Sequence, residues 1–364
     1  MPERIPFRRL YRQYEVLADP GHTKYREDGF AVRELPGALF TIAIDGVSGL
    51  YTGSPTLVKG LSGGEAVARL VEGVFSRLYD SSEPLVDVMR RANQEVAVMI
   101  REAGFPDDPA VMPGATFAAA KVMESEVEIV TAGDCFALWR TEVDLDSGTG
   151  PLYTQFYGSR NQVQAHDRVL DAGHEATMRQ ILRDMQQFQH DPKENYVING
   201  ANSFISVLPD NAELHRKVRA GELLTLEELP ESWVEQYIRP KMRKIEFSLD
   251  GPVAVARRRN ANNPGVLEGY GLLNGDPRLE ECWQTLTIPR AFRTHLVLCS
   301  DGMVTREVYM DLNPGAVAEF VFGHYLKGGL GVVRQAVEKY EDMHSTASYV
   351  SRAERVGVAV DLRR

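Results

Sequence analysis

The sequence predicts a globular α+β protein, on three observations. The composition is that of an ordinary globular chain, with 43% apolar and 25% charged residues. Short β-prone apolar runs and amphipathic helical segments follow one another along most of the chain. A polar, helix-prone segment at residues 167–243 interrupts this pattern. We therefore expect a single domain over residues 1–364 that carries a helical insertion or flap at 167–243.

The first half alternates strand and helix signals, in the order strand 39–44, helices 65–79 and 84–103, and strands 114–122, 127–132 and 136–140. The run 39–44 (LFTIAI) is apolar and β-prone and ends at Asp45-Gly46, which predicts a buried strand followed by a tight turn. Both helices are predicted from apolar residues at helical spacing. Gly104 stands where the second helix should have its C-terminal cap.

The second half begins with the segment 167–243, which lacks short apolar strands. Strand signals then return, and the expected elements are strands 244–249, 253–255 and 295–299, helices 314–325 and 330–343, and a last strand at 355–361. A glycine-rich loop is expected at 265–275.

Charge and composition exclude several classes of protein. The 41 basic and 51 acidic residues give a formal net charge of −10, which argues against nucleic-acid binding. No apolar run reaches the roughly 18 residues of a membrane helix, and residues 1–13 lack the apolar core of a secretory signal. Three scattered cysteines, Cys135, Cys282 and Cys299, indicate neither a disulfide framework nor a zinc site. We therefore expect a cytoplasmic protein without a nucleic-acid or membrane partner.

Acidic residues recur at the ends of the expected strands. Asp45, Asp134 and Asp301 each follow an apolar run and lie beside glycine, and the pair Glu27-Asp28 precedes another apolar run. If these strand ends lie together, their carboxylates repel one another unless a cation neutralises them. Oxygen ligands without histidine or cysteine favour Mg²⁺ or Mn²⁺. A glycine after the aspartate leaves room for its backbone carbonyl to approach an ion.

The alternative interpretation of these residues is purely structural. Asp-Gly after a strand is a common turn signal, so any one of these sites taken alone favours a turn over a metal ligand. Four acidic sites along one chain, three at strand ends and one at a strand start, are harder to explain in this way. Spacing alone therefore leaves both the metal-site hypothesis and the turn interpretation open.

The order of these motifs resembles a known family. EDGFAV, AIDGVSG, PGATFAAAKV with TAGDC, LVLCSDGM and a terminal strand follow one another as in the protein phosphatase 2C family of metal-dependent serine/threonine phosphatases. The resemblance runs from about residue 20 to the C-terminus, and residues 167–243 have no counterpart in it. It implies a four-layer α-β-β-α sandwich, with a central antiparallel β-sandwich between two layers of helices.

The resemblance also implies a site with two Mg²⁺ or Mn²⁺ ions. Asp45 would bridge both ions and the Gly46 carbonyl would bind one; Asp301 would bind the first ion, and Glu27 and Asp28 the second, directly or through water. Asp134, with Asp301, would match a third and weaker site. The implied reaction is hydrolysis of phosphoserine or phosphothreonine in proteins by metal-activated water, with Asp45, Asp28 and Asp301 as the catalytic residues.

Two positions depart from the family pattern. Ala353 stands where the last metal-binding aspartate is expected, so Glu354 is the predicted replacement, with Asp342, His344 or a water as alternatives. Thr23 stands where an arginine often binds the substrate phosphate, so His22 and Lys24 are the predicted phosphate ligands, with Arg26 as an alternative. The alternative function is therefore a catalytically weakened phosphatase-fold module that binds a protein partner. The sequence predicts no oligomeric state.

One glycine-rich segment, Gly60–Gly64, precedes a predicted helix. A helix N-terminus can bind an anion, but this segment lacks the Gly-Lys-Ser/Thr of a nucleotide-binding loop. We therefore expect a plain loop at the start of the helix.

Overall fold

The computed structural model describes residues 11–21, 26–48, 58–109, 111–144, 152–163, 208–220, 222–238, 258–266, 269–291, 293–309, 313–344 and 354–363, with 168, 172, 176, 178–183 and 185. The chain divides into two compact units. One comprises Met1–Ala165 and Ala256–Arg364, and the other comprises His166–Val255.

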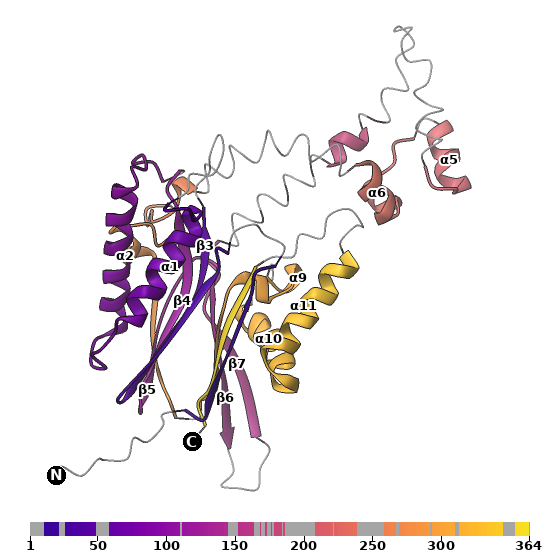
Figure 1. The fold of residues 1–364 in the computed structure, drawn as a ribbon. Coiled ribbons are helices and arrows are strands. Elements are labelled where there is room, and N and C mark those ends of the chain that lie inside the picture. The colour runs from indigo at the N-terminus through magenta and orange to yellow at the C-terminus, as the bar shows by residue number, and fades with distance from the viewer. Residues whose placement is uncertain are drawn as a thin grey trace, which may run out of the picture. The chain divides into compact units, whose positions relative to one another are not determined.

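Two antiparallel five-stranded sheets form the centre of the first unit (Figure 1). One sheet has the order β1-β10-β9-β6-β7, with β1 Gln13–Asp19, β10 Arg355–Asp361, β9 Arg293–Cys299, β6 Phe136–Asp144 and β7 Leu152–Gly158. The other has the order β2-β3-β4-β5-β8, with β2 Gly29–Leu35, β3 Ala38–Val47, β4 Gly114–Val122, β5 Glu126–Ala132 and β8 Gln284–Pro289.

Each sheet has its own helical layer on its outer face. Figure 1 shows α1 and α2 beside the sheet that contains β3, β4 and β5, and α10 and α11 beside the sheet that contains β6 and β7. The bounds are α1 Gly63–Ser76, α2 Leu85–Glu102, α10 Pro314–Gly328 and α11 Leu330–His344, with the short helices α8 Leu279–Cys282, η2 Asp301–Met303 and α9 Arg306–Tyr309. The predicted α+β class and its α-β-β-α layers are confirmed.

Strand β3 shows why the central strands are continuous apolar runs. Successive side chains of a strand point to opposite faces of the sheet. Phe40 and Ile42 pack in the core beneath α1 and α2, whereas Leu39 and Ala43 pack in the core between the two sheets. Both faces are covered, which favours apolar residues along nearly the whole strand, and the sequence signal is strong.

The ends of the first two helices follow from local chemistry. Ser62 is the N-cap of α1, and its hydroxyl accepts a hydrogen bond from the Glu65 N–H at 3.2 Å. Beyond the end of α2, Gly104 has φ +74° and its N–H donates to the Arg101 carbonyl at 3.1 Å. The predicted glycine cap is therefore confirmed.

One prediction about the strands is wrong. Asp45 and Gly46 do not form a turn after β3; they lie inside it, because Thr116 and Ala115 of β4 continue the ladder opposite them. Strand β6 follows β5 along the chain but pairs with β7 and β9 in the other sheet. Strands β1, β7 and β8 were not predicted, and all three lie at edges of the sheets.

The second unit is helical in its described part. It contains α5 Ala212–Arg219, the 3-10 helix η1 Leu226–Glu228 and α6 Glu231–Tyr237, and no strand is present among its described residues. Leu214, Val218 and Trp233 belong to its own apolar core. The organisation as a single domain with a helical insertion or flap at 167–243 stays a prediction. The strands expected at 244–249 and 253–255 lie outside the described residues.

None of the helices in the described ranges combines the length and the apolar character that crossing a membrane requires.

Core packing against α1 allows a first prediction about stability. Phe75 is 0% exposed in the core between α1 and its sheet, whereas Tyr79, just beyond the helix, is 89% exposed. Replacing Phe75 by alanine leaves a cavity, so we expect Phe75→Ala to lower the free energy of unfolding by about 3–5 kcal/mol. Tyr79→Ala is the matched control and should change it by less than about 0.5 kcal/mol. Urea denaturation measures both, and equal effects would contradict the packing described.

Candidate metal centre

The strand register brings three of the predicted acids to one end of the sheets. Asp45, near the end of β3, pairs with Thr116 of β4. β4 in turn pairs with β5, which ends two residues before Asp134. In the other sheet, the first residue of β6, Phe136, pairs with Cys299, two residues before Asp301. The end of β9 therefore lies beside the turn that contains Asp134.

Asp28 and Asp45 form the centre of this cluster. Asp28 is buried, and Asp45 stays partly exposed although protein surrounds most of it. Burial raises the pKa of both carboxyl groups well above the ordinary value, and the negative charge of Asp301 raises both further. Glu354 adds to the effect on the pKa of Asp28, and Asp134 to that on the pKa of Asp45. The charge of Asp28 also raises the pKa of Asp45.

Positive charge does not balance this pair within the described residues. No described lysine, arginine or histidine forms an ion pair with Asp28 or Asp45. Neighbouring carboxylates cannot all stay ionised in a poorly solvated place without a cation. The site therefore has the electrostatics of a cation-binding site.

Hydrogen bonds attach Asp28 to the first sheet. The Ser300 hydroxyl, at the end of β9, donates to Asp28 Oδ2 at 2.8 Å. The Asp28 backbone N–H donates to Glu354 Oε2 at 2.7 Å, and Glu354 stands directly before β10. The structure thus places Glu354 beside the predicted acids. Ala353 lies outside the described residues.

Glu27 is held differently from its neighbour. Its Oε1 accepts hydrogen bonds from the hydroxyls of Ser48 and Ser62, the latter at 2.5 Å. Because Ser62 is the N-cap of α1, the carboxylate lies at the positive end of that helix. The loop predicted at Gly60–Gly64 ends at Ser62, because Gly63 and Gly64 already belong to α1, and the Glu27 carboxylate lies at this helix start. The Glu27 Oε1 already accepts two hydrogen bonds. Of the two predicted modes of contact with an ion, direct or through water, these bonds favour the one through water.

Close backbone packing explains the glycine after Asp45. A Cβ at Gly46 would lie 2.4 Å from the Glu27 carbonyl oxygen and 2.6 Å from the Gly64 carbonyl oxygen. The Gly46 N–H donates to that same Glu27 oxygen at 3.1 Å. Three segments therefore meet at Gly46: the end of β3, the chain before β2 and the first turn of α1.

Thr116 positions Asp134. Its Oγ1 donates to Asp134 Oδ1 at 2.8 Å and lies 3.5 Å from the Cys135 sulfur. Burial, together with the charge of Asp45, raises the pKa of the Cys135 thiol, so this cysteine stays protonated and unreactive. Thr116 was not among the predicted site residues; its role follows from its place opposite Asp45, which only the strand register shows.

The predicted phosphate ligands His22 and Lys24 lie outside the described residues. A basic side chain that the sequence analysis did not single out is close to the site. Arg258 is buried, and its Nη2 donates to the Ser48 carbonyl at 2.7 Å, three residues beyond Asp45. No local motif distinguishes Arg258, because its segment reaches the site only through long-range packing.

The donor chemistry of the cluster fits Mg²⁺ or Mn²⁺. All of its ligand candidates offer oxygen, which hard divalent ions prefer. In the described ranges, no three His, Cys, Asp or Glu side chains point at a common ion position. Instead the carboxyl groups of Asp28 and Glu27 accept hydrogen bonds from hydroxyls, and that of Glu354 accepts one from a backbone N–H.

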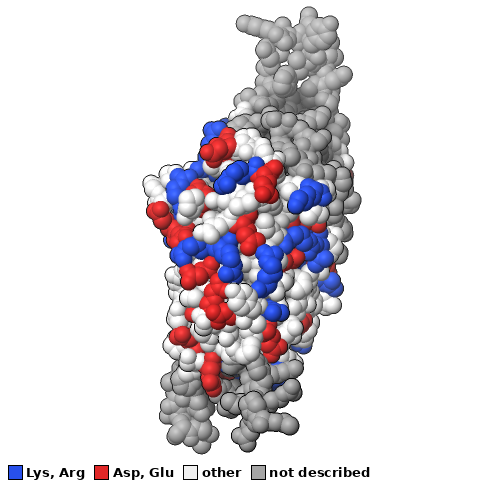
Figure 2. All heavy atoms as spheres, turned by 60° about the vertical axis from the view of Figure 1, so that its left-hand side comes forward, with Lys and Arg blue, Asp and Glu red and all other residues white. Residues whose placement is uncertain are grey.

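The face that bears α1 and α2 carries both signs of charge. Figure 2 shows Lys and Arg interspersed with Asp and Glu over this face. Pairs such as Arg77–Glu95, at 2.6 Å, and Arg90–Glu280, at 2.7 Å, join the two signs. This face therefore offers no continuous basic surface of the kind that binds a phosphate backbone.

Solved structures similar to this chain are serine/threonine phosphatases. A serine/threonine phosphatase from Staphylococcus aureus, Stp1, has 12% identity and a TM-score of 0.44, covering 97% of this chain and 95% of that chain. A serine-threonine phosphatase 2C from Toxoplasma gondii has 12% identity and a TM-score of 0.45, covering 96% and 94%. The catalytic domain of the phosphatase PstP, in complex with two manganese ions, has 14% identity and a TM-score of 0.41, covering 96% of both chains. No protein-family model matches the chain, and no curated protein matches it.

The raised pKa values predict how stability depends on pH. Asp45 binds its proton more tightly in the folded state than in the unfolded state, so metal-free stability falls as the pH rises through the raised pKa. Asp45→Asn removes the carboxyl group whose ionisation lowers the stability of the folded state. In EDTA at pH 7 we expect the free energy of unfolding to rise by roughly 0.5–2 kcal/mol. The gain should shrink toward pH 4, where wild-type Asp45 is protonated.

The control for this prediction is Asp80→Asn. Asp80 is exposed, and hydrogen bonds from Ser82 lower its pKa, so its replacement should give no gain. Chemical denaturation of both variants between pH 4 and pH 7 makes the comparison. A loss of stability in Asp45→Asn at pH 7 would show that the carboxyl cluster is not strained.

Proposed function

We propose that this protein hydrolyses phosphoserine and phosphothreonine in proteins at a two-metal centre, with water as the nucleophile. The buried Asp28–Asp45 carboxyl pair carries the proposal, because Asp134, Asp301 and Glu354 surround it and no described cation balances it. The motif order supports the same family of reactions. The bound ions would activate water and neutralise the charge of the phosphoryl group.

The proposed roles of the residues follow from their positions. Asp45 would be shared between the ions, with the Gly46 carbonyl beside it, and Asp28 and Asp301 would complete the two sites. Glu27 would act through water, because its Oε1 already accepts two hydroxyl hydrogen bonds. Asp134, held by Thr116, would bind the third and weaker ion.

Three further proposals complete the site and its setting. Glu354 would replace the aspartate that is missing at Ala353, since it already touches the backbone of Asp28. His22 and Lys24 remain the proposed ligands of the substrate phosphate. We place the protein in the cytoplasm, where its cysteines, which form no disulfide in the structure, would stay reduced.

The alternative is a phosphatase-fold module that binds a phosphoprotein partner without cleaving it. The replacement at Ala353 favours it, because a site that lost a ligand binds its ion more weakly. Metal binding separates the two functions, since the module needs no tightly bound ions.

The activity prediction concerns two acids, one near the end of β3 and one just beyond the end of β9. Asp45→Asn and Asp301→Asn each remove a charge that would bind an ion. We expect each to lower phosphate release from a phosphopeptide by at least about 100-fold in Mn²⁺. Circular dichroism checks folding, and Asp80→Asn serves as the active control. Robust activity in both variants would remove the proposed function.

A second prediction concerns Glu354. Glu354→Gln keeps an oxygen that can accept from the Asp28 N–H but removes the charge. We expect Mn²⁺ affinity, measured by calorimetry on the full chain, to fall by about 10–100-fold. An unchanged affinity would mean that Glu354 is not a ligand, and an absence of Mn²⁺ binding in the wild type would favour the partner-binding module.

A further inference from the structure

One side-chain amide joins the Asp134 turn to two other segments. Gln162 Oε1 accepts hydrogen bonds from the backbone N–H groups of Gly133 at 2.9 Å and Gly271 at 3.0 Å. Gln162 Nε2 donates to the Cys282 carbonyl at 2.6 Å. The Gln162 backbone N–H also donates to the Gly133 carbonyl at 3.0 Å, so both backbone polar groups of Gly133 bind this residue.

Gly133 directly precedes Asp134 and has little freedom to move. Its φ is +78°, a left-handed conformation that glycine tolerates. A Cβ at this position would lie 2.2 Å from the methyl carbon of Thr116, the residue that binds the Asp134 carboxylate. The direction of Asp134 is therefore set from two sides, by Thr116 at its side chain and by Gln162 at its backbone.

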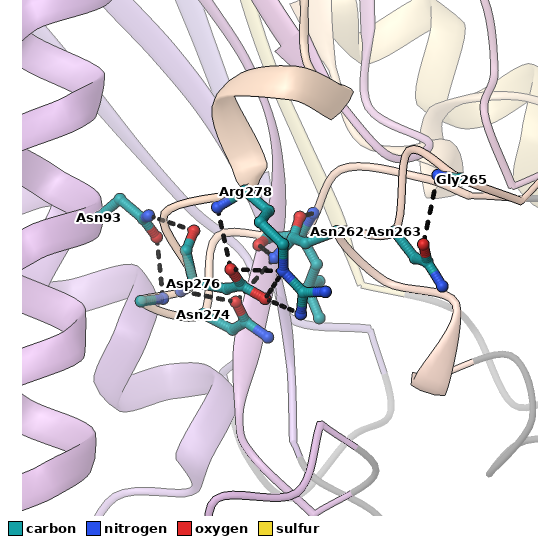
Figure 3. A network of polar contacts seen from close by, with 9 residues as sticks. Asn93, Asn262, Asn263, Gly265, Asn274, Asp276 and Arg278 are labelled. Carbon is teal, nitrogen blue, oxygen red and sulfur yellow. Dashed lines mark hydrogen bonds and ion pairs between the residues drawn. The ribbon is translucent and has the colours of Figure 1, made fainter.

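The other two partners of Gln162 lie on a fixed segment. Asn262 Nδ2 donates to the Leu272 carbonyl at 2.7 Å and to Asn274 Oδ1 at 2.8 Å. Asn93 of α2 accepts from the Gly275 N–H and donates to the Asp276 carbonyl, both at 2.8 Å (Figure 3). The loop that contains Gly271 is thus attached to α2, and it offers Gln162 a rigid point of support.

Gln162 also stands where the chain leaves the first unit. Residues 166–255 form the second unit, and Gly271 and Cys282 belong to the segment that returns from it. Val163, the next residue, packs with Ala261 and Tyr270 of that returning segment. Gln162 therefore connects the outgoing and returning segments, and connects both to the turn of Asp134.

Only an amide of this length supplies what these partners require. An accepting oxygen serves two N–H groups, and a donating nitrogen serves one carbonyl, on a single planar group. Glutamate keeps the acceptor but presents an oxygen to the Cys282 carbonyl. Methionine has a similar length and offers no comparable donor or acceptor.

We propose that Gln162 is a positioning residue for Asp134: it holds the Gly133-Asp134 turn in the conformation that binds the weaker third ion. This inference rests on the proposed function for the existence of that ion. The geometric part, that Gln162 fixes the turn, stands on the four hydrogen bonds alone. Its removal should therefore weaken one class of bound ion and leave the ions at Asp28 and Asp45 in place.

The test compares Gln162→Met with Gln284→Leu in the full chain. Gln284 is the matched control, because it also bonds this segment, accepting from the Arg160 N–H at 3.2 Å and donating to the Arg160 carbonyl at 2.9 Å, with no bond to Gly133. Hydrogen exchange of the Gly133 amide reports on the turn without metal. Electron paramagnetic resonance of free Mn²⁺ during a titration reports on each class of bound ion.

In Gln162→Met we expect Gly133 exchange to rise by about tenfold or more and the weakest class of Mn²⁺ to bind about 10–100-fold more weakly. The tighter Mn²⁺ classes, and both readouts in Gln284→Leu, should stay within about twofold of the wild type. Unchanged exchange, or an equal loss in all Mn²⁺ classes, overturns the proposal, since the second result is what a general loss of structure would give.

Two further outcomes keep the test decisive. If Gln162→Met does not fold, Gln162→Glu replaces it; its retained acceptor should keep Gly133 exchange within about threefold of the wild type, and a rise of tenfold overturns the proposal. If wild-type protein binds no Mn²⁺, the proposed function fails and the metal part of this inference fails with it. The exchange at Gly133 then decides separately whether Gln162 fixes the turn.

Discussion

The central constraint on this structure is the repulsion between acidic groups. The fold brings these groups together at one end of the two sheets. Asp28 and Asp45 both have raised pKa values, because burial and neighbouring acids disfavour their charged forms. Stability alone does not account for such an arrangement, since apolar side chains would fill the same space at less cost. A cation bound there would offset this cost, which supports the proposed metal-dependent function.

The surroundings of the pair show how the fold maintains it. Ser300 and Glu354 join Asp28 to β9 and β10, and the contacts of Gly46 join β3 to α1. These partners come from both sheets and from one helical layer. The site therefore lies where the layers meet, and each layer contributes backbone or side-chain groups that limit the movement of the acids.

The sequence predicted those strands and helices whose residues carry a local signal. Strand β3 was found because both of its faces are covered, and α2 because its stripe and its cap, Gly104, are local. Edge strands β1 and β8 were missed because one face or edge meets solvent, so their sequences (QYEVLAD, QTLTIP) show no apolar run. The sheet to which β6 belongs depends on pairing with β9, more than 150 residues away, and no local pattern encodes that choice.

The same division applies to the site. The acids were found from aspartates at strand ends, whereas Thr116, Gln162 and Arg258 were not, because each acts on a residue brought near by the tertiary fold. The strand prediction failed at Asp45-Gly46 itself, where Asp-Gly looked like a turn and the ladder with β4 instead continues through it.

That continuation has a consequence for binding. Asp45 belongs to a paired strand, with Thr116 opposite it and the Gly46 N–H bonded to Glu27 on the other side. A ligand mounted on a loop must be ordered when its ion arrives, and that ordering lowers affinity. Asp45 is already immobilised by the ladder, so binding of an ion at the proposed site would require rotation of side chains alone, with the main chain preorganised.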